Sequence, residues 1–149
     1  MGIFDSHGRP LRYGGDTDRY FFQLGERPLK PDQYLNNNLD FYSQGKMRHH
    51  CLKYGDYIFE YDDKGFRKSP YYLTSDDYSW NYSIKGYSNI TPDKLTSCIE
   101  NSGRFTASKY WCSNSSGKKK NNCQDFVYFC LCELDGRLAD RYREKMFQE

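Results

Sequence analysis

The sequence predicts an α+β fold in which a small antiparallel sheet packs with helices. Strand-like segments dominate the chain up to about residue 89, and helix-like segments mainly follow them. The chain holds 15 Tyr and 10 Phe, and aromatic residues are enriched in strands. Its 149 residues suit one domain, and strands followed by helices are typical of the α+β class.

The predicted strands begin in a loop-dominated arm, residues 1–35, which is rich in Gly, Pro and Asp and contains one short strand, RYFFQL. Residues 36–149 are expected to form the globular domain. Within it LDFY, MRHHCLKY and YIFEY are predicted as consecutive antiparallel strands, separated by turns at residues 43–45 and 55–56. The turn sequence DDKG, residues 62–65, is expected to close this block, and the aromatic stretch 69–89 to add one strand and long loops.

Three helices are expected in the second part of the chain. In TPDKLTSCIENSG, Thr91 can cap the first turn, Pro92 suits the first helical position, and Gly103 can end the helix. RFTASKYW alternates weakly as a strand, and SNSSGKKK resembles a solvated loop. The second helix follows NNC, breaks near Asp135 and Gly136, and leads to the charged third helix, RLADRYREKMFQE.

The composition excludes several function classes. The chain has no apolar run of the roughly 18 residues that a membrane-spanning helix needs. Its start lacks the pattern of a secretory signal, which predicts an intracellular protein. A net charge of +2 gives no drive toward nucleic acid. None of the six cysteines is in C-x-x-C spacing, so we expect free thiols and no structural zinc or other metal site.

Cys123 is placed where a nucleophile would be useful. Asn121 or Asn122 can cap the helix, so the thiol lies in the first turn, where the helix dipole and free N–H groups favour a thiolate and an oxyanion. The alternative is that Cys123 is the first residue of a buried apolar stripe. The two readings stay open on this feature alone.

A thiolate nucleophile needs a base, and the chain has three histidines, His7, His49 and His50. His7 lies in the arm and is interpreted as incidental. Strand alternation sends His49 and His50 to opposite faces of a sheet, so the run HHC is not a metal cluster. One of the two imidazoles can therefore face a helix packed on the sheet.

Two short motifs carry a family resemblance. HHCLKYGDYIFEY resembles the His-bearing strand turn, and NNCQDFV the nucleophile segment, of the circularly permuted NlpC-type papain-like proteins. The nearest in pattern are the lecithin–retinol acyltransferase and phospholipase A/acyltransferase families. The resemblance covers about residues 39–134. It implies a permuted papain-like fold, Cys123 as nucleophile and His49 as base, with no metal or organic cofactor.

The sequence departs from that family at two places. The acyltransferases carry a second His on the following strand, where this chain offers Phe59, Glu60 or Tyr61, and Gln124 and Asp125 replace a Glu-His pair. Glu60 is our candidate to orient His49. Asn122 and Gln124 are the candidate supports of an oxyanion site at the Cys123 N–H.

The resemblance implies a hydrolase or acyltransferase that cleaves an ester, amide or thioester. Its substrate would be an acyl lipid, an isopeptide bond or a peptide-type amide, and the sequence does not select among them. The alternative is an inactive papain-like scaffold that binds a protein through the aromatic segment 70–89.

Further candidate contacts lie at the surface. His50 is a candidate substrate contact, with packing or surface exposure as the alternative. Lys118, Lys119 and Lys120 could meet an anionic substrate or headgroup, but we favour a solvated loop tip for these lysines. MGIFDS fits the myristoylation pattern at Gly2, and one such chain would give weak, reversible membrane contact. We therefore expect a cytoplasmic protein, peripheral at a membrane if Gly2 is acylated.

Overall fold

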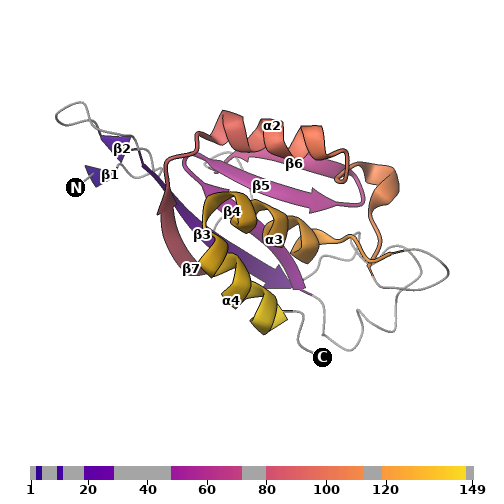
Figure 1. Ribbon diagram of the computed structural model, residues 1–149. Helices are drawn as coiled ribbons and strands as arrows, with labels where there is room; N and C mark the ends of the chain where they lie inside the picture. Colours follow the sequence, from indigo (N-terminus) through magenta and orange to yellow (C-terminus); the bar gives the residue numbers. More distant parts are fainter. Residues whose placement is uncertain are drawn as a thin grey trace.

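A five-stranded antiparallel sheet is the centre of the computed structural model, which describes residues 3–4, 10–11, 19–28, 48–71, 80–112 and 119–146 (Figure 1). The strands lie in the order β6-β5-β4-β3-β7. Their bounds are β3 Tyr20–Pro28, β4 Arg48–Tyr54, β5 Tyr57–Asp62, β6 Gly65–Pro70 and β7 Asn81–Ser88. Strands β1 (Ile3–Phe4) and β2 (Pro10–Leu11) form a separate antiparallel pair.

Helices follow the sheet in the chain, which confirms the predicted α+β class. They are α2 (Pro92–Ser102), the short 3₁₀ helix η4 (Ala107–Lys109), α3 (Cys123–Leu134) and α4 (Gly136–Met146). None of the helices in the described ranges has the length and apolar character needed to cross a membrane.

The sheet extends beyond the segments that the sequence suggested. Strand β3 falls inside residues 1–35, yet it lies between β4 and β7, so this part of the expected arm belongs to the sheet. Residues 62–65 do not end the sheet but turn the chain into β6, with Gly65 at φ +98°. The hairpin between β4 and β5 turns at Gly55, φ +59°, as expected. The predicted strand 39–42 and turn 43–45 lie outside the described residues.

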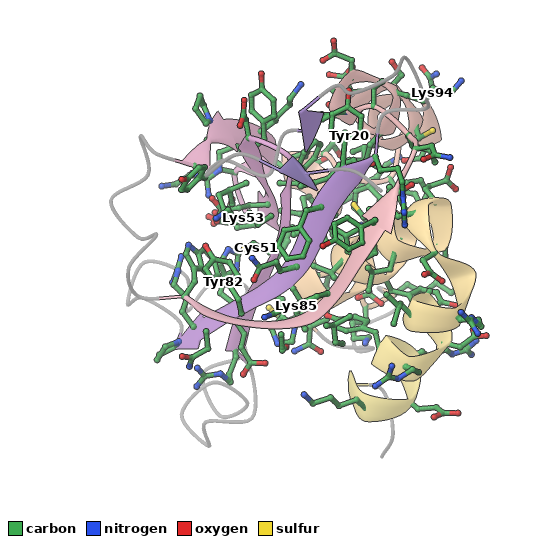
Figure 2. The ribbon with its side chains drawn as sticks, turned by 90° about the vertical axis from the view of Figure 1, so that its left-hand side faces the viewer. Tyr20, Cys51, Lys53, Tyr82, Lys85 and Lys94 are labelled. Atoms are coloured by element: carbon green, nitrogen blue, oxygen red, sulfur yellow. The ribbon has the colours of Figure 1, made fainter. Side chains whose placement is uncertain are left out.

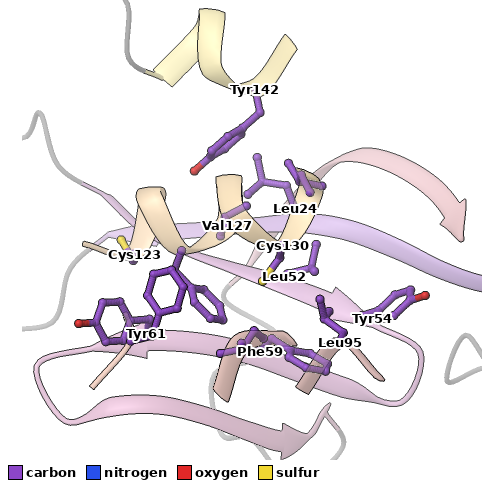
Figure 3. Packing of buried hydrophobic residues seen from close by; sticks show 14 of the residues in the cluster. Leu24, Leu52, Tyr54, Phe59, Tyr61, Leu95, Cys123, Val127, Cys130 and Tyr142 are labelled. Carbon is purple, nitrogen blue, oxygen red and sulfur yellow. The ribbon is translucent and has the colours of Figure 1, made fainter. Parts of the chain in front are cut away.

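The two faces of the sheet are covered differently. Leu52 and Tyr54 of β4 pack with α3, α4 and α2 in the main core (Figure 3). Cys51 of β4 lies on the other face, in a small cluster with Ile58 and Trp80. Figure 2 looks onto this second face, where Cys51, Lys53 and Tyr82 are labelled. The strand alternation of β4 therefore decides which histidine faces the helices.

The helix α2 begins and ends as its sequence predicts. The Thr91 side chain accepts a hydrogen bond from the N–H of Lys94, and Gly103 closes the helix in the left-handed region at φ +67°. Within residues 104–111, expected as a weak strand, 107–109 form η4, and Trp111 makes a single antiparallel bridge to Asn121. This bridge brings the chain directly to the start of α3.

Candidate active site

Cys123 is the first residue of α3, and its sulfur lies against the backbone of β4. The N–H of His50 donates to Sγ at 3.5 Å, and the thiol donates to the carbonyl oxygen of Arg48 at 3.6 Å. Both peptide groups flank His49. The strand pairing explains the access: β4 and β5 pair from Cys51 onward, and the described register includes no β5 partner for residues 48–50. The sulfur meets the start of β4, where the strand pairs with β3 and has no described β5 partner.

Burial governs the protonation of this thiol. The side chain of Cys123 is fully buried, and burial raises its pKa to about 12, while the His50 N–H lowers it to a smaller extent. The rise from its ordinary value of 9.0 corresponds to about 4 kcal/mol, more than the roughly 2 kcal/mol at most that a helix terminus supplies. In this arrangement Cys123 is a neutral thiol, whereas the sequence predicted that the helix start would favour a thiolate.

Asn122 fixes the start of α3. Its side-chain oxygen accepts from the N–H groups of Gln124 (2.9 Å) and Asp125 (3.3 Å), and its amide donates to the Cys112 carbonyl at 3.2 Å. Asp125 returns a bond to the Asn122 N–H at 2.9 Å, which completes a capping box. Asn122 therefore holds the helix rather than facing a substrate. The cap binds the N–H groups of Gln124 and Asp125. The N–H of Cys123 is therefore the one that remains available among the first three residues of α3.

His49 is paired with Glu60 across β4 and β5. Nε2 of His49 lies 2.8 Å from Oε1 of Glu60, and both side chains are buried. Burial pushes the pKa of Glu60 up, but the hydrogen bond and charge of His49, with Arg67 and Arg27, bring its pKa below the ordinary value. Glu60 is therefore a carboxylate that accepts a hydrogen bond from Nε2–H of His49.

Nδ1 is the second ring nitrogen of His49. Nδ1 of His49 is buried, and among the described residues it has no hydrogen-bond partner. The His49 ring packs against Trp80, with the ring centroids 5.7 Å apart, and Nε1 of Trp80 is also buried without a described partner. A buried polar atom without a hydrogen bond costs about 1–3 kcal/mol, so Nδ1 of His49 and Nε1 of Trp80 are two polar atoms that a ligand or a further residue could satisfy.

The sulfur of Cys123 contacts the backbone on both sides of His49 but not the His49 side chain. The sulfur reaches the peptide groups on both sides of residue 49 from α3. The His49 ring lies on the opposite face of β4, with Trp80 and Glu60. Among the described residues the thiol makes no hydrogen bond to either imidazole.

His50 faces the helices instead. Its Nδ1 lies 2.8 Å from the hydroxyl of Tyr142, which reaches from α4 toward α3 (Figure 3). Burial, followed by the charges of His49, Arg48 and Lys145, lowers the pKa of His50 to about 3. His50 is 2 % exposed, so it is a packed residue of the main core and not the surface contact considered from the sequence.

The remaining residues that the sequence suggested as site residues are Gln124, the three lysines 118–120 and Gly2. Gln124 is half-buried in the first turn of α3. Lys120 forms an ion pair with Asp125 at 3.6 Å, and Lys119 is exposed. Lys118 and Gly2 lie outside the described residues. In the described ranges, no group of three His, Cys, Asp or Glu side chains could hold a metal ion.

Trp80, Arg27 and Tyr142 belong to the site, and sequence reasoning missed them. Arg27 pairs with His49 in the register of β3 and β4, and its guanidinium lies 5.0 Å from the centre of the Trp80 ring. No local motif marks these residues, because each reaches the site through strand order or helix packing.

Comparisons of the chain with protein-family models, with curated proteins and with solved structures give no match.

Proposed function

We propose that this protein is a cysteine-dependent hydrolase or acyltransferase of the permuted papain-like type, acting on an ester, amide or thioester carbonyl. Cys123 is the nucleophile, His49 the base and Glu60 the residue that orients the base. The proposal rests on the two sequence motifs together with the geometry around them.

One observation supports the proposal most directly. One ring nitrogen of His49 is held by a buried carboxylate and the other has no partner among the described residues, while the sulfur of Cys123 contacts the peptide groups on both sides of the same residue. A carboxylate on one nitrogen fixes the tautomer and stabilises an imidazolium, and the other nitrogen is then the proton acceptor.

The proposed reaction requires the start of β4 or of α3 to move, because the Cys123 sulfur and the His49 ring lie on opposite faces of β4 and rotation of the Cys123 side chain alone cannot bring them together. The thiol proton passes to Nδ1, and the sulfur attacks the carbonyl carbon of the substrate. The Cys123 N–H stabilises the oxyanion, and the imidazolium returns its proton to the leaving group. Water or a second acyl acceptor then attacks the thioester, with His49 as base, and releases Cys123. We place this chemistry in the cytoplasm, where the six free thiols would persist.

The second candidate function is a binding scaffold without turnover. It is favoured by the fully buried thiol, whose pKa is raised to about 12 by burial, and by the absence of a thiol–imidazole hydrogen bond among the described residues. Its partner would be a protein that contacts the aromatic β7 side of the molecule, where Tyr87 is 44 % exposed.

Acylation by p-nitrophenyl acetate separates the two candidates. The test protein carries Cys98→Ser and Cys132→Ser, because these two thiols are half-buried and exposed and would react without any catalysis. We expect a p-nitrophenolate burst of about one equivalent and an acetyl group on Cys123 by mass spectrometry. His49→Asn should slow the burst by about 100-fold or more, as expected for loss of a general base.

The matched control is Cys51, which is as fully buried as Cys123 but lies in β4, on the second face of the sheet. Cys51→Ser should leave the burst unchanged, and Cys123→Ser should abolish it. Acylation of Cys123 that is no faster than that of Cys51, in a folded protein, would reject the enzyme and leave the scaffold.

A further inference from the structure

A cavity of about 650 Å³ lies beside the start of α3, away from the His49–Glu60 pair. Its volume is within the range of small-molecule sites, roughly 300–1,000 Å³. The described residues that line it are Arg104, Ser108, Lys109, Tyr110, Trp111, Lys119, Lys120 and Asn121. They come from η4 and its flanks and from the residues just before Cys123, which the Trp111–Asn121 bridge holds together.

The lining has a strong charge bias. Four of the eight described lining residues are cationic, and none of the eight is acidic. The whole chain is nearly balanced, with 22 basic and 20 acidic residues, so this local excess does not follow from composition. A concave surface lined by one sign of charge concentrates ions of the opposite sign. The cavity is therefore suited to an anion with more than one negative charge.

The cations keep most of their charge available. Arg104 is directed by packing over the Phe105 ring at 4.9 Å and by a 3.4 Å bond to the Asn121 side-chain oxygen, which is neutral. Lys109 donates to the Gly103 carbonyl at 2.6 Å, which is also neutral. Of the four cations, Lys120 is the one that forms an ion pair among the described residues, with Asp125. Among the described residues, Lys119 forms no ion pair.

Of the four described lining residues that are not cationic, Tyr110 and Trp111 are aromatic, and Ser108 and Asn121 are polar. Tyr110 is buried, whereas Trp111 is half-buried and lines the cavity beside the lysines. An indole face next to ammonium and guanidinium groups suits a ligand that joins an anionic group to a flat or apolar portion. A phosphate monoester supplies about −1.5 to −2 charges and three acceptor oxygens at pH 7.

We propose that this cavity binds an organic phosphate, with the phosphate at Lys109, Lys119 and Arg104 and the organic portion against Trp111. The site is argued from its own lining and does not depend on acyl transfer at Cys123. The phosphate group is the recognised chemistry, and it can belong to a soluble ester or to a lipid headgroup.

The test is calorimetric titration of the full chain carrying Cys123→Ser, so that turnover cannot contribute. Phenyl phosphate is the soluble probe, and methyl phosphate is the same anion without a ring. Vesicles of phosphatidylcholine with and without phosphatidic acid test the lipid source. We expect phenyl phosphate to bind more tightly than methyl phosphate, and its affinity to fall as salt rises.

Lys119→Gln and Lys109→Gln should each lower the affinity for phenyl phosphate by about fivefold, which is the effect of losing one partly exposed ionic contact. Lys85→Gln, an exposed lysine of β7 outside the cavity, is the matched control and should change the affinity by less than about twofold. Binding of phosphatidic acid vesicles alone, weakened by the same two variants, would support the site with a lipid as its source.

The proposal is overturned if neither phosphate source binds, or if Lys85→Gln weakens binding as much as Lys119→Gln does. The acylation burst of Cys123 is a separate readout, so failure here leaves the proposed enzyme standing. Failure of the burst likewise leaves the phosphate site standing.

Discussion

Nε2 of His49 lies 2.8 Å from Oε1 of Glu60, although the two residues are eleven positions apart on neighbouring strands. Strands β4 and β5 pair Cys51 with Glu60, so the carboxylate reaches His49 diagonally on the same face of the sheet. The family that the sequence resembles places a histidine on this second strand. A carboxylate at this point supplies a stronger acceptor for the imidazole N–H than a neutral ring would.

Glu60→Gln tests whether this pair is part of the catalytic unit. The amide removes the negative charge that stabilises an imidazolium, while it keeps the size of the side chain. We expect the acylation rate of Cys123 by p-nitrophenyl acetate to fall by about 100-fold or more, because His49 loses both its fixed tautomer and its charge partner.

Glu100→Gln is the control for this change, since Glu100 is exposed on α2 and far along the chain from the pair. Its acylation rate should stay that of the parent. A Glu60→Gln protein that folds and reacts at the parent rate would show that Glu60 has no part in the reaction.

The buried His50 should make the free energy of unfolding fall in acid. Burial lowers its pKa from 6.5 to about 3 in the folded protein, so the unfolded chain takes up a proton that the folded protein excludes. The free energy of unfolding is therefore complete above about pH 6.5 and falls as the pH drops toward 3. The slope is up to about 1.4 kcal/mol per pH unit. We expect a loss of roughly 2 kcal/mol between pH 7 and pH 5 in urea unfolding.

His50→Asn should flatten the curve between pH 6.5 and pH 5, because the amide keeps a hydrogen-bonding group near Tyr142 but does not titrate. Glu60 also has a lowered pKa, and its contribution is lost only as the pH falls below its ordinary value of 4.5. Glu60→Gln should consequently leave the slope between pH 6.5 and pH 5 intact. An unchanged slope in His50→Asn would assign the acid sensitivity to another group.

The local elements were predictable because their signals are local. Thr91, Pro92 and Gly103 mark both ends of α2, and Asn122 marks the start of α3, as the structure confirms. The alternation of β4 predicted that His49 and His50 face opposite sides, and their partners Trp80 and Tyr142 lie on opposite faces.

The sequence could not predict what depends on strand order and depth. RYFFQL looked like a short strand in a loose arm, because nothing local shows that β3 pairs on both sides. The thiolate expected at Cys123 came from the helix dipole, whereas the burial that outweighs it arises from packing of α3 on β4. The partner of His50, Tyr142, is 92 positions away, and no spacing rule connects them.

Asn122→Ala should destabilise the protein more than an ordinary cap substitution. The change removes the cap of two N–H groups and leaves the Cys112 carbonyl without its amide donor, all in a residue that is 1 % exposed. A cap is worth about 1 kcal/mol and a lost hydrogen bond to a buried group about 1–3 kcal/mol, so we expect a loss of about 2–4 kcal/mol in urea unfolding.

Thr91→Ala is the matched cap substitution, because Thr91 is the exposed cap of α2 and makes one capping bond. It should cost about 1 kcal/mol. Equal losses in the two variants would mean that the bond from Asn122 to the Cys112 carbonyl contributes nothing measurable to stability.

Gly86 on β7 marks a tight contact between the sheet and α4. A Cβ built at this position would lie 2.5 Å from Cζ of Phe22 and 3.0 Å from Cδ1 of Leu138, both side chains packed in the main core. Phe22 is fully buried and cannot move aside without disturbing its neighbours. Gly86→Ala should therefore lower the free energy of unfolding by about 1–3 kcal/mol, the range for an overpacked core.

Gly136→Ala, in α4, should not lower the free energy of unfolding. Gly136 begins α4, and a Cβ there meets no atom within 4 Å. Alanine also restricts the unfolded chain, so this change should be neutral or stabilise by up to about 1 kcal/mol. Urea unfolding of both variants measures the contrast. If Gly86→Ala were as stable as the parent, β7 and α4 would have to separate easily, and the contact of Leu138 with this strand would not help to fix α4 over the sheet.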